Sequence, residues 1–278
     1  MHRRRRSSPE RPRRRSLLLL LAGGLGLAAP VQAAPDPPAT GVFGTIPLFW
    51  GEAAGPAEVL SGAAPPHWAR DLLERDGPLI PLAMLDGAQL AGLTRLVIAQ
   101  PRAFSPQENV ALDRWVRAGG RLLLFADPLL TGESVFALGD RRRPQDVVLL
   151  SPLLRHWGLE LLFDPAQPES GEPREIAGTP LPTSLAGHFA ILPADTACKL
   201  QAADLLAECR VGAGRAVVLA DAALLDIHHP PPGSAEALAA LLAFSFAEGA
   251  AMAENSGLSP GASDAEQPSA PDRLRDMP

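Results

Sequence analysis

One stretch most constrains the fold, because it reads as a strand, a capped helix and a second strand. Residues 95–99 (Arg-Leu-Val-Ile-Ala) and 121–126 (Arg-Leu-Leu-Leu-Phe-Ala) are short, nearly continuous apolar runs. Between them Ser105 and Glu108 have the spacing of a capping box, and Gly119 with Gly120 ends the helix. A unit of this length predicts two parallel strands joined by a right-handed crossover.

The same alternation continues along the chain and predicts an α/β domain over residues 42–249. Near-continuous apolar strands covered by helices are typical of a mostly parallel sheet in three layers. Residues 165–187, rich in Pro, Gly and Glu, predict a long loop. The other expected strands are residues 42–48, 79–83, 159–163 and 215–220, and the expected helices are 67–75, 105–118, 151–158 and 234–248.

The two cysteines predict an antiparallel hairpin near the C-terminal part of the domain. Residues 196–202 and 205–211 read as strands around a tight turn. In that register Cys198 faces Cys209, and facing side chains lie within reach of a disulfide. Ala-Asp is a poor turn, so a slipped register with two buried thiols is the alternative. Gly212 to Gly214 predicts a second hairpin turn rather than a phosphate-binding loop.

The first 33 residues have the order of a secretory signal peptide. Eight arginines precede an apolar run at 17–29, and Val31-Gln32-Ala33 offers a cleavage site with small residues. Export to the periplasm is therefore expected, by the general or the twin-arginine route, and an uncleaved anchor is the alternative. Residues 34–41 read as a linker, and 250–278 read as a disordered tail because they hold few large apolar residues.

Removal of the signal peptide makes the protein acidic. The remaining chain has 17 basic and 30 acidic residues, a net charge of −13. Such a surface repels phosphate groups, which excludes nucleic acid as a partner. Association with a membrane is then expected only through partner proteins or an uncleaved signal.

Four polar residues follow expected strands and define the candidate site: Glu52, Gln100, Asp127 and Asp221. In open α/β sheets, ligands bind at the carboxyl ends of the strands. These side chains could therefore line one crevice and bind a ligand, or supply an acid and a base. The alternative is that they cap the turns that follow the strands.

No nucleophile or metal motif accompanies these residues. The sequence has no G-x-S-x-G elbow, and paired cysteines supply no free thiol. His228-His229 precedes three prolines and predicts a solvated loop, as does Arg141-Arg142-Arg143. We therefore expect no catalytic residue, no cofactor and no metal, which predicts that the chain is not an enzyme.

Several segments resemble a known family. Residues 47–52 (Pro-Leu-Phe-Trp-Gly-Glu) resemble the opening of a group of exported bacterial proteins. Residues 96–101, 112–116 and 119–123 resemble the core of GldG-type domains, which occur in gliding-motility and ABC-transporter auxiliary proteins. The resemblance implies a flavodoxin-like fold, similar to class I glutamine amidotransferases without their catalytic Cys. It carries over no catalytic residue, and this chain lacks the C-terminal membrane helix of longer members.

The sequence thus predicts an exported, non-enzymatic binding or assembly module, an accessory protein of an ABC transporter in the cell envelope. Its expected partners are membrane transporter subunits or a small polar ligand. A carboxylate-dependent hydrolase and a periplasmic sugar-binding protein are the alternatives. A hydrolase needs the carboxylates around an accessible pocket, a sugar receptor needs a pocket with apolar walls, and an assembly module needs exposed apolar side chains.

Overall fold

The structure is a computed structural model that describes residues 37–52, 55–61, 65–168 and 174–247. The predicted signal peptide and tail lie outside the described residues. Among the described residues, no helix is long and apolar enough to cross a lipid bilayer.

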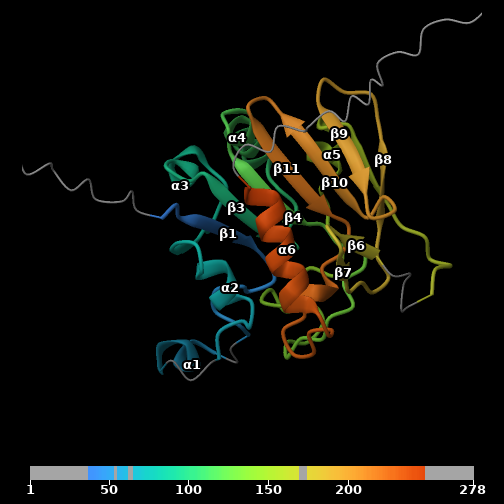
Figure 1. Cartoon of the computed structure of the whole chain (residues 1–278). Helices are drawn as coiled ribbons and strands as arrows, with labels where there is room; N and C mark the ends of the chain where they lie inside the picture. The colour runs from blue at the N-terminus through green and yellow to red at the C-terminus, as the bar shows by residue number, and fades with distance from the viewer. Residues whose placement is uncertain (1–36, 53–54, 62–64, 169–173, 248–278) are drawn as a thin grey trace, which may run out of the picture. The chain divides into compact units, whose positions relative to one another are not determined.

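The centre of the domain is a seven-stranded, mostly parallel sheet in the order β2-β1-β3-β4-β11-β10-β9 (Figure 1). The first five strands in this order run parallel, and β10 and β9 continue the sheet as antiparallel strands. The strands are β1 Thr40–Gly44, β2 Leu79–Pro81, β3 Arg95–Ala99, β4 Arg121–Phe125, β9 Ala197–Gln201, β10 Leu206–Val211 and β11 Gly214–Leu219.

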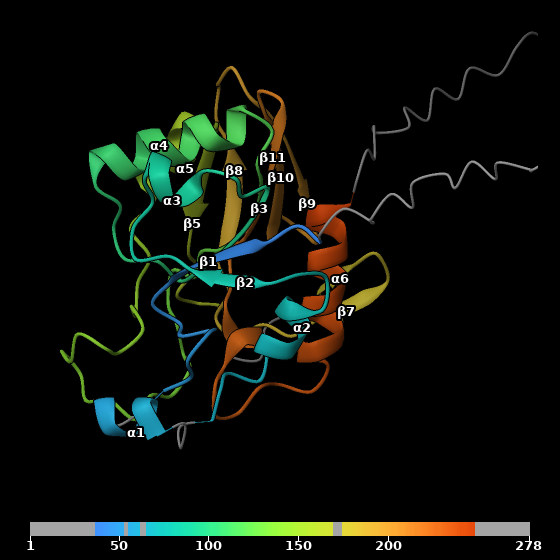
Figure 2. The ribbon, with the colours of Figure 1, turned by 90° about the vertical axis from the view of Figure 1, so that its left-hand side faces the viewer.

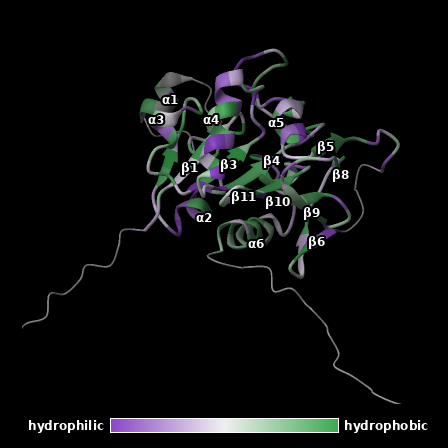
Figure 3. Ribbon diagram, turned by 90° about the horizontal axis from the view of Figure 1, so that it is seen from above, coloured by the Kyte–Doolittle hydropathy of each residue, from purple (hydrophilic) through white to green (hydrophobic). Residues whose placement is uncertain are grey.

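Helices lie on both faces of this sheet (Figure 3). On one face are α3 (Gly87–Leu90), α4 (Pro106–Arg117) and α5 (Ser151–His156), and on the other are α2 (Arg70–Glu74) and α6 (Ser234–Phe246). Figure 2 shows the same separation of α4 from α2 and α6 in a second view. The short helices α1 (Pro56–Ser61) and η1 (Ala223–Leu225) follow β1 and β11.

The hydrophobic core is densest around β3, β4 and β11. Residues 96–99, 122–126 and 216–220 are fully or almost fully buried. Burial on both faces explains why these strands are apolar at successive positions rather than at alternate ones. The mixed α/β class, the mostly parallel sheet and the hairpin predicted from the sequence are confirmed.

The hairpin of β9 and β10 has the predicted register. Cys198 pairs with Cys209 across the two strands, and a disulfide joins them. The turn between the strands places Ala202, Ala203 and Asp204 at positive φ. Such a backbone is unfavourable for residues with a Cβ, so the cross-link and the packing of the strands hold a strained turn.

The structure corrects the loop predicted over residues 165–187. It contains a second hairpin, β6 (Arg174–Ile176) and β7 (Thr179–Leu181), which contacts α6. Next to it β5 (Leu159–Leu162) pairs with β8 (His188–Ile191). The prediction failed because β6 and β7 are short, and in these two strands only Ile176 and Leu181 are buried enough to leave an apolar signal.

The structure also moves the first strand toward the N-terminus. β1 begins at Thr40, inside the segment predicted as a linker, and ends at Gly44 instead of residue 48. Gly44 has a φ of 144°, and a Cβ there would lie 1.9 Å from the carbonyl oxygen of Ala99. The close approach of the β1 and β3 backbones requires glycine at this position, and the backbone turns away from the sheet here.

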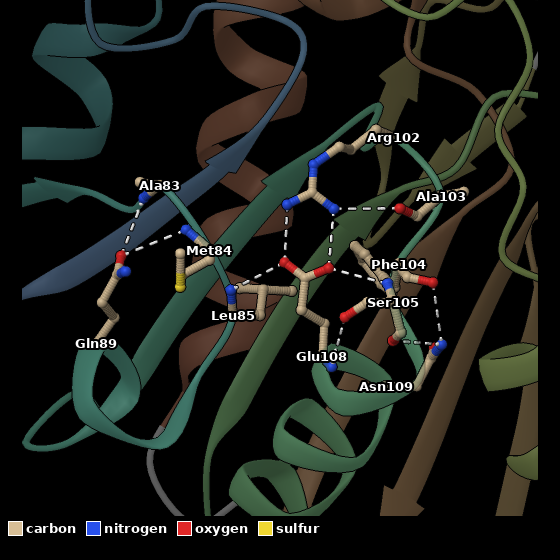
Figure 4. Close-up of polar contacts among 10 residues, drawn as sticks. All are labelled: Ala83, Met84, Leu85, Gln89, Arg102, Ala103, Phe104, Ser105, Glu108 and Asn109. Atoms are coloured by element: carbon tan, nitrogen blue, oxygen red, sulfur yellow. Dashed lines mark hydrogen bonds and ion pairs between the residues drawn. The ribbon is translucent and has the colours of Figure 1, made fainter.

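The capping box at the start of α4 is present, and an ion pair between the exposed Arg102 and the buried Glu108 strengthens it (Figure 4). The Ser105 hydroxyl accepts the backbone N–H of Glu108 at 3.2 Å, and the Glu108 carboxylate accepts the N–H of Ser105 at 2.9 Å. Both carboxylate oxygens of Glu108 also accept hydrogen bonds from Arg102 at 2.8 Å, which lowers the pKa of Glu108 to about 2.

We predict that Ser105→Ala lowers the free energy of unfolding by about 1 kcal/mol, because one N–H in the first turn of α4 loses its acceptor. Urea denaturation measures the change. Gln107→Ala is the matched control, because Gln107 is exposed in the same turn and its truncation should stay within about 0.5 kcal/mol. Equal effects of the two substitutions would contradict the role of the cap.

Candidate functional site

The carboxyl ends of the parallel strands gather at one edge of the sheet, where the sequence placed the candidate site. Gln100, Asp127 and Asp221 directly follow or lie two residues beyond β3, β4 and β11, which are neighbouring strands. The structure therefore brings three of the four predicted residues to adjacent positions. All three have 0% of their surface exposed.

The Gln100 side chain is fully used in holding two backbone segments. Its amide nitrogen donates to the carbonyl oxygens of Asp127 at 3.0 Å and Gln145 at 2.9 Å, and its amide oxygen accepts the N–H of Asp127 at 2.9 Å. Its backbone has a φ of 45°, which is uncommon for a residue with a side chain. The strained backbone turns this amide toward β4 instead of into solvent.

Asp127 and Asp221 form a buried pair of carboxyl groups. Asp127 accepts backbone N–H groups of Leu129 at 2.8 Å and Ala222 at 3.0 Å. Burial raises the pKa of Asp127 to about 6. Asp221 accepts those of Ser184 at 3.0 Å and Ala223 at 2.7 Å. Burial, and then the charge of Asp127, raise the pKa of Asp221 well above its usual range.

These contacts give the pair a structural role. In each residue one carboxyl oxygen caps the turn that follows, at Leu129 or Ala223, and the other holds a distant segment, at Ala222 or Ser184. The raised pKa values favour a protonated Asp221, which can lie beside Asp127 without charge repulsion. Both residues are fully buried and their carboxyl oxygens are bonded to backbone N–H groups, so ligand binding at this crevice stays a prediction.

Glu52 has hydrogen-bond partners that differ from those of the other three residues. Its side chain is fully buried. It accepts hydrogen bonds from the Ser134 hydroxyl at 2.6 Å and the N–H of Val135 at 2.8 Å, and it lies 3.1 Å from Nε2 of His228. Glu52 thus ties the segment after β1 to those after β4 and β11.

The two neighbouring histidines lie on a loop that is capped by an aspartate. The Asp226 carboxylate accepts the backbone N–H groups of His228 at 2.9 Å and His229 at 2.7 Å. His229 is largely exposed and lies 3.8 Å from Glu133. Within the described part of the chain, no group of three or more His, Cys, Asp and Glu side chains is arranged to hold a metal ion.

Sequence reasoning missed a pocket at the end of β1, with a volume of about 190 Å³. The loop after β1 supplies Phe49 and Trp50 to its wall, and β2 supplies Pro81. Trp50 is 53% exposed. The available signal was the pair of adjacent aromatic residues in a loop between Pro47 and Gly51, since two neighbours in a tight turn rarely bury both rings.

The sequence matches no protein-family model and no curated protein. Solved structures with a similar backbone include an exo-β-1,4-mannosidase from Opitutaceae bacterium strain TAV5, at 14% identity and a TM-score of 0.43. A β-galactosidase from Halorubrum lacusprofundi has 16% identity and a TM-score of 0.41, and a ThuA-like protein from Bacteroides uniformis has 9% and 0.38.

These likenesses differ in how much of each protein they cover. They include 76%, 76% and 78% of this chain, in the same order, but 36%, 30% and 94% of the other proteins. The chain therefore spans about a third of the length of the two glycosidases. At these identities and TM-scores the likenesses assign no activity or substrate to this chain.

The expectation that the chain is not an enzyme is contradicted by this comparison. Several of the similar structures are glycoside hydrolases, namely a mannosidase and β-galactosidases. Glycosidases use two carboxyl groups that leave no short motif, so the lack of a nucleophile motif in the sequence does not exclude catalysis. The absence of catalysis is therefore not part of the function proposed below.

Proposed function

We propose that this domain is an exported binding module of the cell envelope and that segment 128–150, after β4, is its partner-binding surface. One observation carries the proposal. Four large apolar side chains of this segment face solvent: Val135 is 61% exposed, Leu138 80%, Val147 48% and Leu149 62%. Exposed apolar side chains that gather in one segment are typical of protein interaction sites.

The backbone contacts of this segment support the proposal. It contains no helix or strand, yet Leu130 bonds to the carbonyl of Asp146, and Val148 bonds to that of Asp127. Gln100 holds Gln145, and Glu52 holds Val135. A surface that is already fixed loses less conformational entropy when a partner binds. Gln100 and Glu52 thus hold segment 128–150 in position.

The nature of the partner rests on the sequence. The export signal and the resemblance of residues 96–123 to GldG-type domains favour a subunit of an ABC transporter as the partner. We propose accordingly a flavodoxin-like fold in three layers. The strand order β2-β1-β3-β4-β11 supports it, because the same order is found in flavodoxin and CheY.

Site-specific photo-crosslinking in the native host tests the proposal. A photoreactive residue at Leu138 should give a discrete cross-linked product with a membrane transporter subunit. The same residue at Val110, which is 57% exposed on α4, is the matched control and should give none. Identical products at both positions, or a product at neither, would refute a partner at segment 128–150.

A further inference from the structure

We infer that the pocket at the end of β1, walled by Phe49 and Trp50, is a binding site for an uncharged sugar ring. None of the residues that line this pocket belongs to segment 128–150. It lies at the carboxyl ends of β1 and β2, on the side of β1 that faces β2. Open α/β sheets bind ligands outside the carboxyl ends of their strands.

The indole N–H of Trp50 differs from those of the other three tryptophans in its hydrogen bonding. Trp68 donates its indole N–H to the Asp226 carbonyl, Trp115 to the Leu93 carbonyl, and Trp157 to the Asp113 carboxylate, each within 2.9 Å. Among the described residues the indole N–H of Trp50 has no hydrogen-bond acceptor, and Trp50 is 53% exposed. Trp50 therefore offers both a free aromatic surface and a free donor.

The surrounding contacts hold Trp50 in place. Its ring meets Phe49 edge to face, with centroids 4.5 Å apart. Phe49 is fixed by Arg70, whose guanidinium lies 4.1 Å from the ring centroid and donates to the Phe49 carbonyl at 3.2 Å. Arg70 is in turn paired with Glu74. The exposed ring is thus supported by an ordered set of contacts and does not depend on a ligand for its position.

The chemistry of the wall selects the ligand class. No residue that lines the pocket has an ionisable side chain, so a charged ligand would lose its hydration without gaining a partner. The pocket volume of about 190 Å³ gives a single sugar ring room to enter. The negative π-face of Trp50 attracts the C–H groups of a flat sugar face, and its N–H can donate to a hydroxyl oxygen.

Heteronuclear NMR with indole ¹⁵N labels tests this inference directly. The four tryptophans give separate indole signals, and the loss of one in Trp50→Phe assigns it. Glucose, galactose, mannose and N-acetylglucosamine are titrated one by one, each also as its methyl glycoside. At least one sugar should shift the Trp50 signal saturably and leave the three hydrogen-bonded indoles unchanged. A methyl glycoside that binds like the free sugar indicates the end of a glycan as the natural ligand, whereas selective binding of the free sugar indicates a monosaccharide.

Three comparisons make the result decisive. Trp50→Ala should weaken sugar binding at least tenfold, whereas Val110→Ala, at an exposed position on α4, should leave it unchanged. Glucuronate, a sugar ring with a carboxylate, should bind at least tenfold more weakly than glucose. The inference is overturned if no sugar shifts the Trp50 signal, if glucuronate binds as well as glucose, or if Trp50→Ala binds normally. Thermal melts confirm that both variants are folded, as expected for exposed positions.

Discussion

Reduction of the Cys198–Cys209 disulfide is expected to lower the free energy of unfolding by about 3 kcal/mol. The two cysteines are 11 residues apart in the sequence. Opening a loop of that size increases the conformational entropy of the unfolded chain, which lowers the free energy of unfolding by about this amount. For a domain of this length the melting temperature should fall by about 6–12 °C. Among the described strands, β9 is the last in the sheet and pairs only with β10.

The strained turn makes this cross-link more important than the loop size alone suggests. Without it the register of β9 depends on Ala203 and Asp204 in a left-handed conformation that both residues disfavour. Asp204→Gly should therefore recover about 1 kcal/mol in the reduced protein, because glycine adopts that conformation freely. Calorimetry with and without reductant measures both effects. A melting temperature that reductant leaves unchanged, with alkylation proving that both thiols are free, would contradict the prediction.

The parts of the fold that were predictable carry their signal within a few residues. Ser105 and Glu108 cap α4 through contacts three residues apart, and the β3 and β4 runs must be buried on both faces wherever they lie. The register of Cys198 against Cys209 follows from a turn that begins four residues after the first cysteine. In each case local geometry determines the structure and tertiary contacts only reinforce it.

The candidate site was predictable in place but not in orientation. The order of strands brings Gln100, Asp127 and Asp221 together, as their positions after parallel strands predicted. Whether they face a crevice depends on donors that lie far away in sequence, such as the N–H of Ser184. The exposure of Trp50 likewise depends on Arg70 holding Phe49. Long-range contacts of this kind leave no pattern in a single sequence.

His67 links the loop before α2 to the segment after β11 and is expected to make stability depend on pH. It is only 2% exposed. Its Nδ1 accepts the backbone N–H of Ala69 at 3.0 Å, so the proton is on Nε2, which donates to the Leu225 carbonyl at 3.1 Å. Burial lowers the pKa of His67 from 6.5 to about 4, against the opposing effects of the Leu225 hydrogen bond and the Asp226 charge.

The sign of the effect follows from proton binding. Between pH 6.5 and 4 the unfolded chain binds a proton at His67 that the folded protein does not bind, so stability decreases as the pH falls. With a folded-state pKa of about 4, the loss by pH 4 is about 3 kcal/mol, and stability is fully restored above pH 6.5. Asp127 and Asp221 act in the opposite direction, because their raised pKa values make the folded state the better proton acceptor. Only a comparison of variants isolates the histidine.

His67→Asn is therefore predicted to change from destabilising to stabilising as the pH falls. Asparagine can still accept the N–H of Ala69 but loses the bond to Leu225, which costs about 1 kcal/mol at pH 7.5. At pH 4 the wild type has lost about 3 kcal/mol that the variant retains, so the variant should be more stable by about 2 kcal/mol. Urea titrations across this range measure the crossing, and His229→Asn, at an exposed histidine, should shift the curve at neither pH. Parallel stability curves for the wild type and His67→Asn would show that His67 titrates equally in the folded and unfolded states, because only a pKa that differs between those states can change their free-energy difference with pH.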